Sequence, residues 1–186
     1  LAPHNDARRS STNTNDLRGK VLRIKVNDDG TYSIPAGNMF PVGKARTRPE
    51  IYAMGFRNPF RVQVDEDGVA YIADYSPDSQ SPTGLRAAQG TGRIEIVRKP
   101  SNYGWPMCYK TDLPMYKWDF NTATTLGETY DCDSPDHGPT NTSRWNTGLL
   151  QSPALTNPDL WYSYRDDLWG TPCIDNYNVA VPVQGS

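Results

Sequence analysis

Residues 48–78 read RPEIYAMGFRNPFRVQVDEDGVAYIADYSPD. Three segments of this stretch, 50–54, 60–65 and 69–74, are rich in β-branched and aromatic residues and have the length of strands. The middle segment carries on one side Phe60, Val62 and Val64. Asp-Glu-Asp-Gly joins the last two segments and is typical of a hairpin turn, because its Gly accepts a positive φ. A Gly-Phe-Arg-Asn-Pro corner precedes the hairpin and an oxygen-rich loop follows it, so the stretch predicts most of a small antiparallel sheet.

The same pattern of alternating residues and Gly-containing turns extends to both sides of this stretch. Residues 19–26 alternate and turn through Asn-Asp-Asp-Gly into residues 31–35. Residues 92–99 predict another strand, with Ile94 and Ile96 facing one way. No segment shows a sustained helical period of 3.6 residues. Short strands with repeated turns therefore predict an all-β fold: a sandwich, a barrel or a propeller.

Composition divides the chain into three parts. We expect residues 1–18 to be a polar arm or loop, residues 19–106 to hold most strands, and residues 107–186 to be a loop-rich extension of the same domain. Strand patterns are scarce in the last part, with candidates at 160–164 and 178–183. The tryptophans gather in the second half of the chain, where they anchor irregular loops or, alternatively, stack on sugar rings. Those considered for stacking are Trp118, Trp145, Trp161 and Trp169.

Charge and hydropathy exclude two classes of partner. The 186 residues include 19 basic and 21 acidic side chains, a balance that gives no electrostatic reason to bind nucleic acid. No apolar run approaches the roughly 18 residues that a membrane span requires. The first residues lack the apolar core of a signal peptide and do not begin with Met, so we expect a mature or trimmed chain.

The three cysteines, Cys108, Cys132 and Cys173, lie far apart without a CxxC spacing, which disfavours a zinc site or a thioredoxin-like motif. A disulfide between the first two would close a loop of modest length and stabilise the fold by about 3 kcal/mol. It would leave Cys173 without a partner in this chain. The alternative is three reduced, buried thiols.

The chain resembles the glucose/sorbosone dehydrogenase family in the order and spacing of several short motifs. These are GKVLRI, IPAGNMF, RPEIYAMGFRNPFR, the Gly-turned hairpin, DYSPD and KPSNYGWP. The resemblance covers residues 17–106 well and continues more loosely through residues 107–173, where it is most similar to secreted, multi-module actinobacterial members. It implies a six-bladed β-propeller, a sugar substrate, use of pyrroloquinoline quinone with calcium in several members, and a secreted or extracellular location.

The resemblance assigns cofactor binding to Arg57 and Asn58, which match the Arg-Asn pair of the family's inner corner. Pyrroloquinoline quinone carries carboxylates and an ortho-quinone. A permanently charged guanidinium and an amide supply charge-assisted and neutral hydrogen-bond donors to such groups.

The resemblance also places a calcium ion at the loop that follows the hairpin. In the family, backbone carbonyls of this loop hold the metal, and the matching positions here are Asp74, Tyr75, Ser76 and Pro77. Asp78 would add a carboxylate. Calcium prefers such hard oxygen ligands. The predicted metal-binding residues are therefore Asp74, Ser76, Pro77 and Asp78, although Asp-Ser-Pro-Asp is also ordinary surface-turn chemistry.

Several departures from the family pattern bear on activity. Many members have His where this chain has Phe56, and Ser76 replaces the loop Gly. The family's general-base His lies on an earlier blade, and neither His4 nor His137 matches its motif. Oxidation of a sugar needs a base to take the hydroxyl proton. A non-catalytic module that binds carbohydrate or a protein partner is therefore the alternative, and a calcium-dependent lactonase-like propeller is a third possibility.

Length agrees with a partial domain. Six four-stranded blades need roughly 24 strands, whereas this chain offers patterns for about eight, so we expect about two blades of a propeller with long, disulfide-tied loops. Exposed strand edges of such a piece would pair with the rest of the propeller or with another chain.

Overall fold

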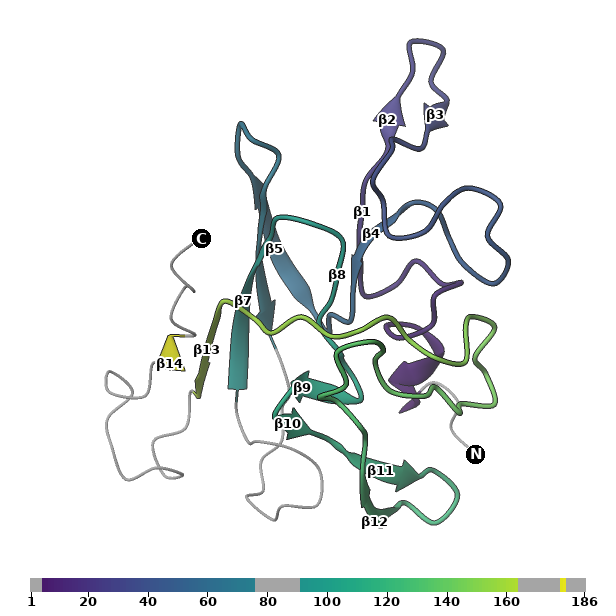
Figure 1. Ribbon diagram of the computed structural model, residues 1–186, viewed down its shortest axis with the longest axis vertical. Coiled ribbons are helices and arrows are strands. Elements are labelled where there is room, and N and C mark those ends of the chain that lie inside the picture. Colours follow the sequence, from purple (N-terminus) through teal and green to yellow (C-terminus); the bar gives the residue numbers. More distant parts are fainter. Residues whose placement is uncertain (1–4, 76–90, 164–177, 180–186) are drawn as a thin grey trace.

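The computed structural model describes residues 5–75, 91–163 and 178–179, and these form strands and loops with one short 3₁₀ helix, η2 (Ala7–Arg9) (Figure 1). In this described part, no helix has the length and apolar character that a membrane crossing would need. The strands lie in two larger sheets and three small hairpins.

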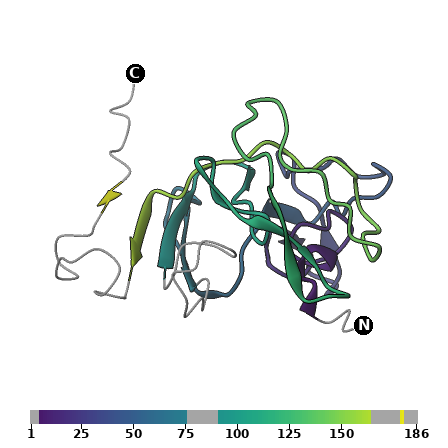
Figure 2. The ribbon, with the colours of Figure 1, turned by 90° about the horizontal axis from the view of Figure 1, so that it is seen from below.

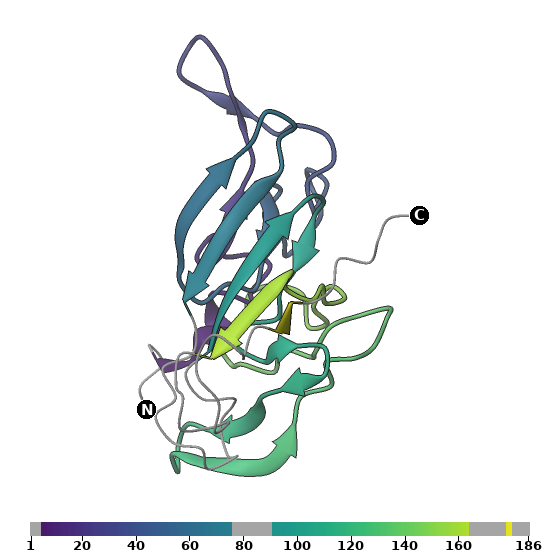
Figure 3. The same cartoon turned by 90° about the vertical axis from the view of Figure 1, so that its left-hand side faces the viewer.

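The largest sheet is antiparallel, with the strand order β14-β13-β7-β6-β5 (Figure 3). Its strands are β5 (Pro59–Val64), β6 (Ala70–Tyr75), β7 (Thr91–Val97), β13 (Leu160–Ser163) and β14 (Asn178–Val179). The predicted Asp-Gly hairpin joins β5 to β6, with Val64 opposite Ala70. Between β6 and β7 the register places Asp74 directly opposite Arg93. Each of the predicted strands of this region is thus present.

The second sheet has the order β1-β4-β8, with β1 (Lys20–Leu22), β4 (Ile51–Met54) and β8 (Ser101–Asn102). β4 is buried along its whole length and pairs with β8 in parallel. The single strand predicted at 19–26 is instead two, interrupted at Arg23 and Ile24; the side chain of Arg23 binds the side chain of Asn38 and the carbonyl of Ala36. Beyond this break, β2 (Lys25–Val26) and β3 (Tyr32–Ser33) form a hairpin.

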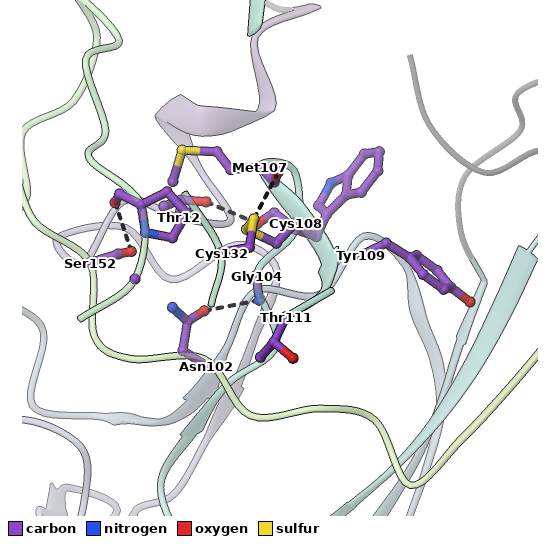
Figure 4. Close-up of a disulfide and its surroundings, with 12 residues drawn as sticks. Thr12, Asn102, Gly104, Met107, Cys108, Tyr109, Thr111, Cys132 and Ser152 are labelled. Atoms are coloured by element: carbon purple, nitrogen blue, oxygen red, sulfur yellow. Dashed lines mark hydrogen bonds between the residues drawn. A yellow bond between two sulfur atoms is a disulfide. The ribbon is translucent and has the colours of Figure 1, made fainter. Parts of the chain in front are cut away.

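The loop-rich extension contains two hairpins that strand patterns did not predict. Their strands are β9 (Cys108–Lys110), β10 (Leu113–Pro114), β11 (Tyr116–Asp119) and β12 (Thr124–Thr129). A disulfide joins Cys108 to Cys132, with 6.0 Å between the Cα atoms, and lies beside Met107 (Figure 4). The predicted disulfide is thus confirmed, and the alternative of three reduced thiols is wrong. Cys173 lies outside the described residues.

Two apolar clusters make up most of the core. The first lies between the two sheets and combines Phe56, Ile72, Val97 and Tyr103 with smaller neighbours. The second surrounds the disulfide and includes Met107, Tyr109, Met115 and Tyr130. The disulfide therefore stabilises a packed part of the extension, and not only a loop.

The polar segment near the N-terminus is packed into the molecule. Ser11, Thr12 and Thr14 are each at most 3% exposed. The Ser11 hydroxyl donates to the carbonyl of Phe56 at 2.7 Å, and the Thr12 hydroxyl donates to that of Trp105 at 2.9 Å. Side-chain hydroxyls can satisfy buried carbonyl groups in this way, so a polar composition is compatible with burial. The segment thus bonds to the loop between β4 and β5, through Phe56, and to the loop that follows β8, through Trp105.

Strand β5 is exposed on both faces from Phe60 to Val64. The row predicted on one side of this strand, Phe60, Val62 and Val64, is 64%, 55% and 53% exposed, and β5 is at the edge of its sheet. No described element covers this row. Its apolar side chains and unpaired main-chain groups are those expected where another strand or blade would pack.

Candidate cofactor-binding corner

The corner, residues Gly55 to Asn58, connects β4 to β5 and is fixed through its main chain. The Oδ1 atom of Asp74, at the end of β6, accepts a hydrogen bond from the main-chain nitrogen of Asn58 at 2.7 Å. Its Oδ2 atom accepts one from that of Arg57 at 3.3 Å. Asp74 is 1% exposed. A buried carboxylate therefore holds the two consecutive residues that are candidates for cofactor binding.

Arg93 of β7 neutralises this carboxylate from the interior. Its Nη2 lies 2.7 Å from Oδ2 of Asp74, and both side chains are fully buried. Nη1 donates to the carbonyl oxygens of Tyr103 at 2.7 Å and Tyr109 at 2.8 Å, and Nη2 also donates to that of Gly55 at 3.2 Å. Five donors in a planar fork suit such convergence on several acceptors. Arg93 thus joins the corner, β6 and the residues after β8.

Glu95, two residues along β7, is a second buried carboxyl group. Its Oε1 lies 3.0 Å from Nε of Arg93 without hydrogen-bond geometry, and neither oxygen has a hydrogen-bond partner among the described residues. Burial raises the pKa of Glu95 to about 8, and the attraction of Arg93 only partly offsets this. Glu95 is therefore mainly protonated at neutral pH, and Asp74 is the carboxylate that balances Arg93.

Replacing Glu95 with Gln is expected to change how stability depends on pH. The unfolded chain releases this proton near pH 4.5 and the folded chain near pH 8. The folded state therefore binds more protons between these values, and the contribution of Glu95 to the free energy of unfolding falls as pH rises, by on the order of 5 kcal/mol across this interval. Gln mimics the neutral acid and lacks this decline. Urea unfolding of both proteins at pH 5, 7 and 9 measures the difference.

The quantity to compare is the difference in unfolding free energy between wild type and Glu95→Gln, because a second buried group changes stability with pH in the opposite direction. Burial lowers the pKa of Lys20 to about 7, from 10.5 in the unfolded chain, so its contribution to stability rises with pH. Lys20 is the same in both proteins and cancels. Glu66→Gln, at an exposed turn position, is the control and should keep the wild-type pH dependence. A constant gap between Glu95→Gln and wild type from pH 5 to 9 would contradict the assignment.

Gly55 begins the corner at a position where only Gly fits. Its φ is +83°, and a Cβ atom there would overlap the main-chain nitrogen of Gly104 and lie 2.9 Å from that of Tyr103. Main-chain bonds fix this approach: Tyr103 donates to Met54 at 2.9 Å, and Trp105 donates to Gly55 at 3.0 Å. The Gly-Phe-Arg-Asn-Pro and Asn-Tyr-Gly-Trp-Pro motifs therefore pack against each other.

The side chains of Arg57 and Asn58 reach the surface, while their main-chain groups face Asp74. Arg57 is half-buried, and its Nη1 donates to the carbonyl of Tyr75 at 3.3 Å. Its guanidinium lies 5.9 Å from the ring centroids of both Tyr75 and Trp105. Asn58 is exposed. A guanidinium and an amide on one rigid corner fit a flat ligand with carboxylate and carbonyl oxygens.

Of the four residues predicted to bind a metal, the structure describes only Asp74. The Asp74 carboxylate is engaged by Arg93 and by the corner, and Ser76, Pro77 and Asp78 lie outside the described residues. Within the described ranges, no cluster of three His, Cys, Asp or Glu side chains could hold a metal. The calcium site stays a prediction, with main-chain carbonyls as its ligands.

The site contains one buried aromatic residue at a position where a His was expected from the resemblance, and two buried ionisable residues that the sequence analysis did not identify. Phe56, at the position where the resemblance gives many members a His, is fully buried, and its ring centroid lies 5.2 Å from that of Tyr103. Arg93 and Glu95 were missed as site residues. The available signal was that two charges of opposite sign alternate with Ile94 and Ile96 inside a strand pattern.

The described strands form mainly antiparallel sheets, with one parallel pair, that do not close into a ring, as expected for part of a β-propeller, and the all-β prediction is confirmed. The family model described as Glucose / Sorbosone dehydrogenase matches residues 3–134, well over half of the chain. The chain therefore belongs to the glucose/sorbosone dehydrogenase family.

Individual relatives are similar over part of the chain. The HIPL1 protein of Arabidopsis thaliana is 30% identical over 115 residues, covering 54% of this chain and 15% of that protein. A Synechocystis protein is 32% identical over 114 residues, covering 58% and 24%. The chain thus spans less than a quarter of the length of these relatives. The apo-form crystal structure of the soluble aldose sugar dehydrogenase of Escherichia coli is 28% identical, with a TM-score of 0.41, covering 56% of this chain and 26% of that one.

Proposed function

We propose that this chain supplies the cofactor-binding corner of a sugar dehydrogenase that uses pyrroloquinoline quinone and calcium. The observation that carries the proposal is the corner itself. Arg57 and Asn58 present a guanidinium and an amide at the surface, while a buried carboxylate holds their main-chain nitrogens. Family membership supports the same assignment.

Each part of the corner has a role in this proposal. When bound, pyrroloquinoline quinone supplies the acceptor for the two electrons removed from a sugar. Arg57 binds a carboxylate or quinone oxygen through charge-assisted hydrogen bonds, and Asn58 donates a neutral one. Asp74 and Arg93 keep both residues oriented before the ligand arrives, which lowers the conformational entropy lost on binding. The loop from Asp74 to Asp78 would hold calcium.

Proton abstraction is assigned to another part of the whole protein. The described part of the chain has no candidate base at the corner. His137 lies in a loop far from the corner in sequence and is half-buried beside the carbonyl of Gly138 and the side chain of Gln151. His4 lies outside the described residues. A further blade would supply the base. The disulfide supports a secreted or extracellular location, where such bonds persist.

Calorimetric titration of the purified protein with pyrroloquinoline quinone, with calcium and with a chelator, tests this proposal. We expect saturable, calcium-dependent binding. Arg57→Ala should weaken it about 10- to 100-fold, because it removes charge-assisted hydrogen bonds of about 1.5 to 3 kcal/mol.

The matched control is Arg61→Ala, which removes an exposed arginine on the adjoining strand β5. Its affinity should equal that of the wild type. Absence of binding by a folded protein would overturn the proposal, as would equal losses in Arg57→Ala and Arg61→Ala.

Non-catalytic binding of carbohydrate or a protein is the second candidate function. It is favoured by the buried Phe56, which replaces a polar family residue with a core side chain. Under this function the corner would keep its frame, and the ligand would bind elsewhere on the chain.

A further inference from the structure

A cavity of about 370 Å³ lies at the meeting point of three segments distant in sequence. These are the residues around η2, the β11–β12 hairpin and the loop at 142–145. Figure 2 shows the N-terminal segment in purple beside the hairpin in green. This volume falls within the range of small-molecule sites. No residue of the corner lines it.

Aromatic rings form part of the cavity wall. Trp118 lies in β11, Phe120 directly follows that strand, and Trp145 comes from the opposite loop. Trp145 is 43% exposed, so one large ring is accessible to a ligand. Two arginines contact these rings: the guanidinium of Arg8 lies 5.2 Å from the Phe120 centroid, and that of Arg144 lies 4.8 Å from the Trp145 centroid.

The polar part of the wall is fixed by its own hydrogen bonds. Oδ1 of Asp6 lies 2.8 Å from Nε of Arg8, and Oδ2 accepts a bond of 2.7 Å from the Ser143 hydroxyl. Arg8 also donates to the Tyr130 hydroxyl at 3.2 Å. Across the cavity, the Asp119 carboxylate accepts from the main-chain nitrogen of Asn121 at 2.8 Å. These groups are thus positioned before any ligand arrives.

The charges that line the cavity balance. Asp6 and Asp119 oppose Arg8 and Arg144. Asp6 and Arg8 already satisfy each other, so the charged groups open to a ligand are those of Asp119 and Arg144. An anionic ligand such as a phosphate would be repelled by the Asp119 carboxylate, and a purely aliphatic ligand would cover both charged groups without offering them hydrogen bonds. A neutral ligand with both donors and acceptors and one apolar face suits these two groups and the rings.

Sugars have this chemistry. The C–H face of a pyranose ring packs on an aromatic ring, and its hydroxyl groups donate to carboxylates and accept from guanidinium and amide groups. We propose that this cavity is a binding site for a neutral carbohydrate, with Trp145 as the stacking platform. It is separate in its residues from the cofactor-binding corner and does not depend on the proposed dehydrogenase function.

The loop that carries Trp145 is anchored by a buried asparagine. Asn141 is 1% exposed; its side chain donates to the carbonyl of Arg8 at 2.8 Å and accepts from the main-chain nitrogen of Ser143 at 3.1 Å. The Asn-Thr-Ser sequence that begins at Asn141 therefore serves the cavity wall, and its amide is not accessible to a glycosyltransferase in the folded chain.

Titration calorimetry of the purified protein with neutral sugars tests the proposal. The probes are glucose, galactose and mannose with their neutral disaccharides, and a sulfated disaccharide serves as the anionic probe. We expect saturable binding of at least one neutral sugar. Trp145→Ala should weaken it at least tenfold, and Trp118→Ala is the second variant. Near-ultraviolet circular dichroism checks that each variant is folded.

Phe60→Ala is the matched control, because it removes an exposed aromatic side chain on β5, outside the cavity. It should bind sugar as the wild type does. Lack of binding of any neutral sugar by the folded protein overturns the proposal, as does tighter binding of the sulfated probe or an equal loss in Phe60→Ala.

The two sites can fail separately. If Trp145→Ala loses sugar binding but keeps pyrroloquinoline quinone binding, and Arg57→Ala does the reverse, both proposals hold. Sugar binding without quinone binding leaves the cavity site intact and removes only the dehydrogenase assignment. Quinone binding without sugar binding to the cavity does the opposite.

Discussion

Replacing Arg93 with Met is expected to lower the free energy of unfolding by about 3 to 5 kcal/mol. Arg93 is 1% exposed and lies 2.7 Å from the buried carboxylate of Asp74. Without the guanidinium, that charge stays in the interior with only two main-chain donors, from Arg57 and Asn58. The carbonyls of Tyr103, Tyr109 and Gly55 also lose a donor. Urea unfolding followed by tryptophan fluorescence measures the loss.

Arg98 gives a matched control just beyond the same strand. Its Nη1 also lies 2.7 Å from a carboxylate, that of Asp159, but its side chain is 58% exposed. Arg98→Met should therefore cost less than about 1 kcal/mol. Adding Asp74→Asn to Arg93→Met should recover part of the loss, because it removes the unpaired charge. Equal losses in the two single variants would show that burial of the Arg93 pair is not what matters.

Replacing Gly55 with Ala should also be strongly destabilising, by about 2 to 5 kcal/mol. Left-handed backbone is unfavourable for Ala by about 1 to 2 kcal/mol, and forcing an extra methyl group into a packed site adds about 1 to 3 kcal/mol. The methyl group would press on the main chain of Tyr103 and Gly104, which cannot move aside like a flexible side chain. Chemical denaturation of the variant gives the number directly.

Gly30 separates these two contributions. Its φ of +81° nearly equals the +83° of Gly55, but nothing lies within 4 Å of where its Cβ would be. Gly30→Ala should show the conformational penalty alone, about 1 to 2 kcal/mol. The extra loss at Gly55 then measures the close packing of the two motifs. If both variants lost the same amount, that packing would have no energetic weight.

Strands and turns of this chain could be predicted because local patterns specify them. The Asp-Glu-Asp-Gly sequence places the β5–β6 hairpin, and alternation places β6 and β7. Arg57 and Asn58 were singled out by resemblance, and the structure brings their main chain to Asp74, a residue also singled out. The predicted strands and turns depend on short stretches of sequence, and the cofactor and metal roles of Arg57, Asn58 and Asp74 stay predictions.

What faces the core in β7 could not be predicted from alternation. Ile94 and Ile96 share one face as expected, yet both are only half-buried, whereas Arg93, Glu95 and Val97 lie in the interior. A charged residue is buried when partners from distant segments neutralise it, and here those partners come from β6 and the corner. Residues 11–14 escaped prediction for the same reason: their polar side chains bond to loops far away in the sequence.

The two hairpins of the extension were missed because β9 and β10 are short and β12 alternates few apolar residues. Their stability comes from the disulfide and the apolar cluster around it. The cavity beside them combines residues near the N-terminus with residues 118–126 and 142–145, so no single segment of sequence could indicate it.

The corner has two sets of positions that can vary separately: the buried residues that shape it and the side chains that it presents at the surface. Asp74 and Arg93 bind the main chain of the corner, so the shape of the corner does not depend on which side chains Arg57 and Asn58 carry. A descendant could exchange either of these for another residue and acquire a different ligand while retaining a folded blade. Substitution of Arg57 or Asn58 therefore changes what the corner can bind without removing the main-chain bonds that shape it.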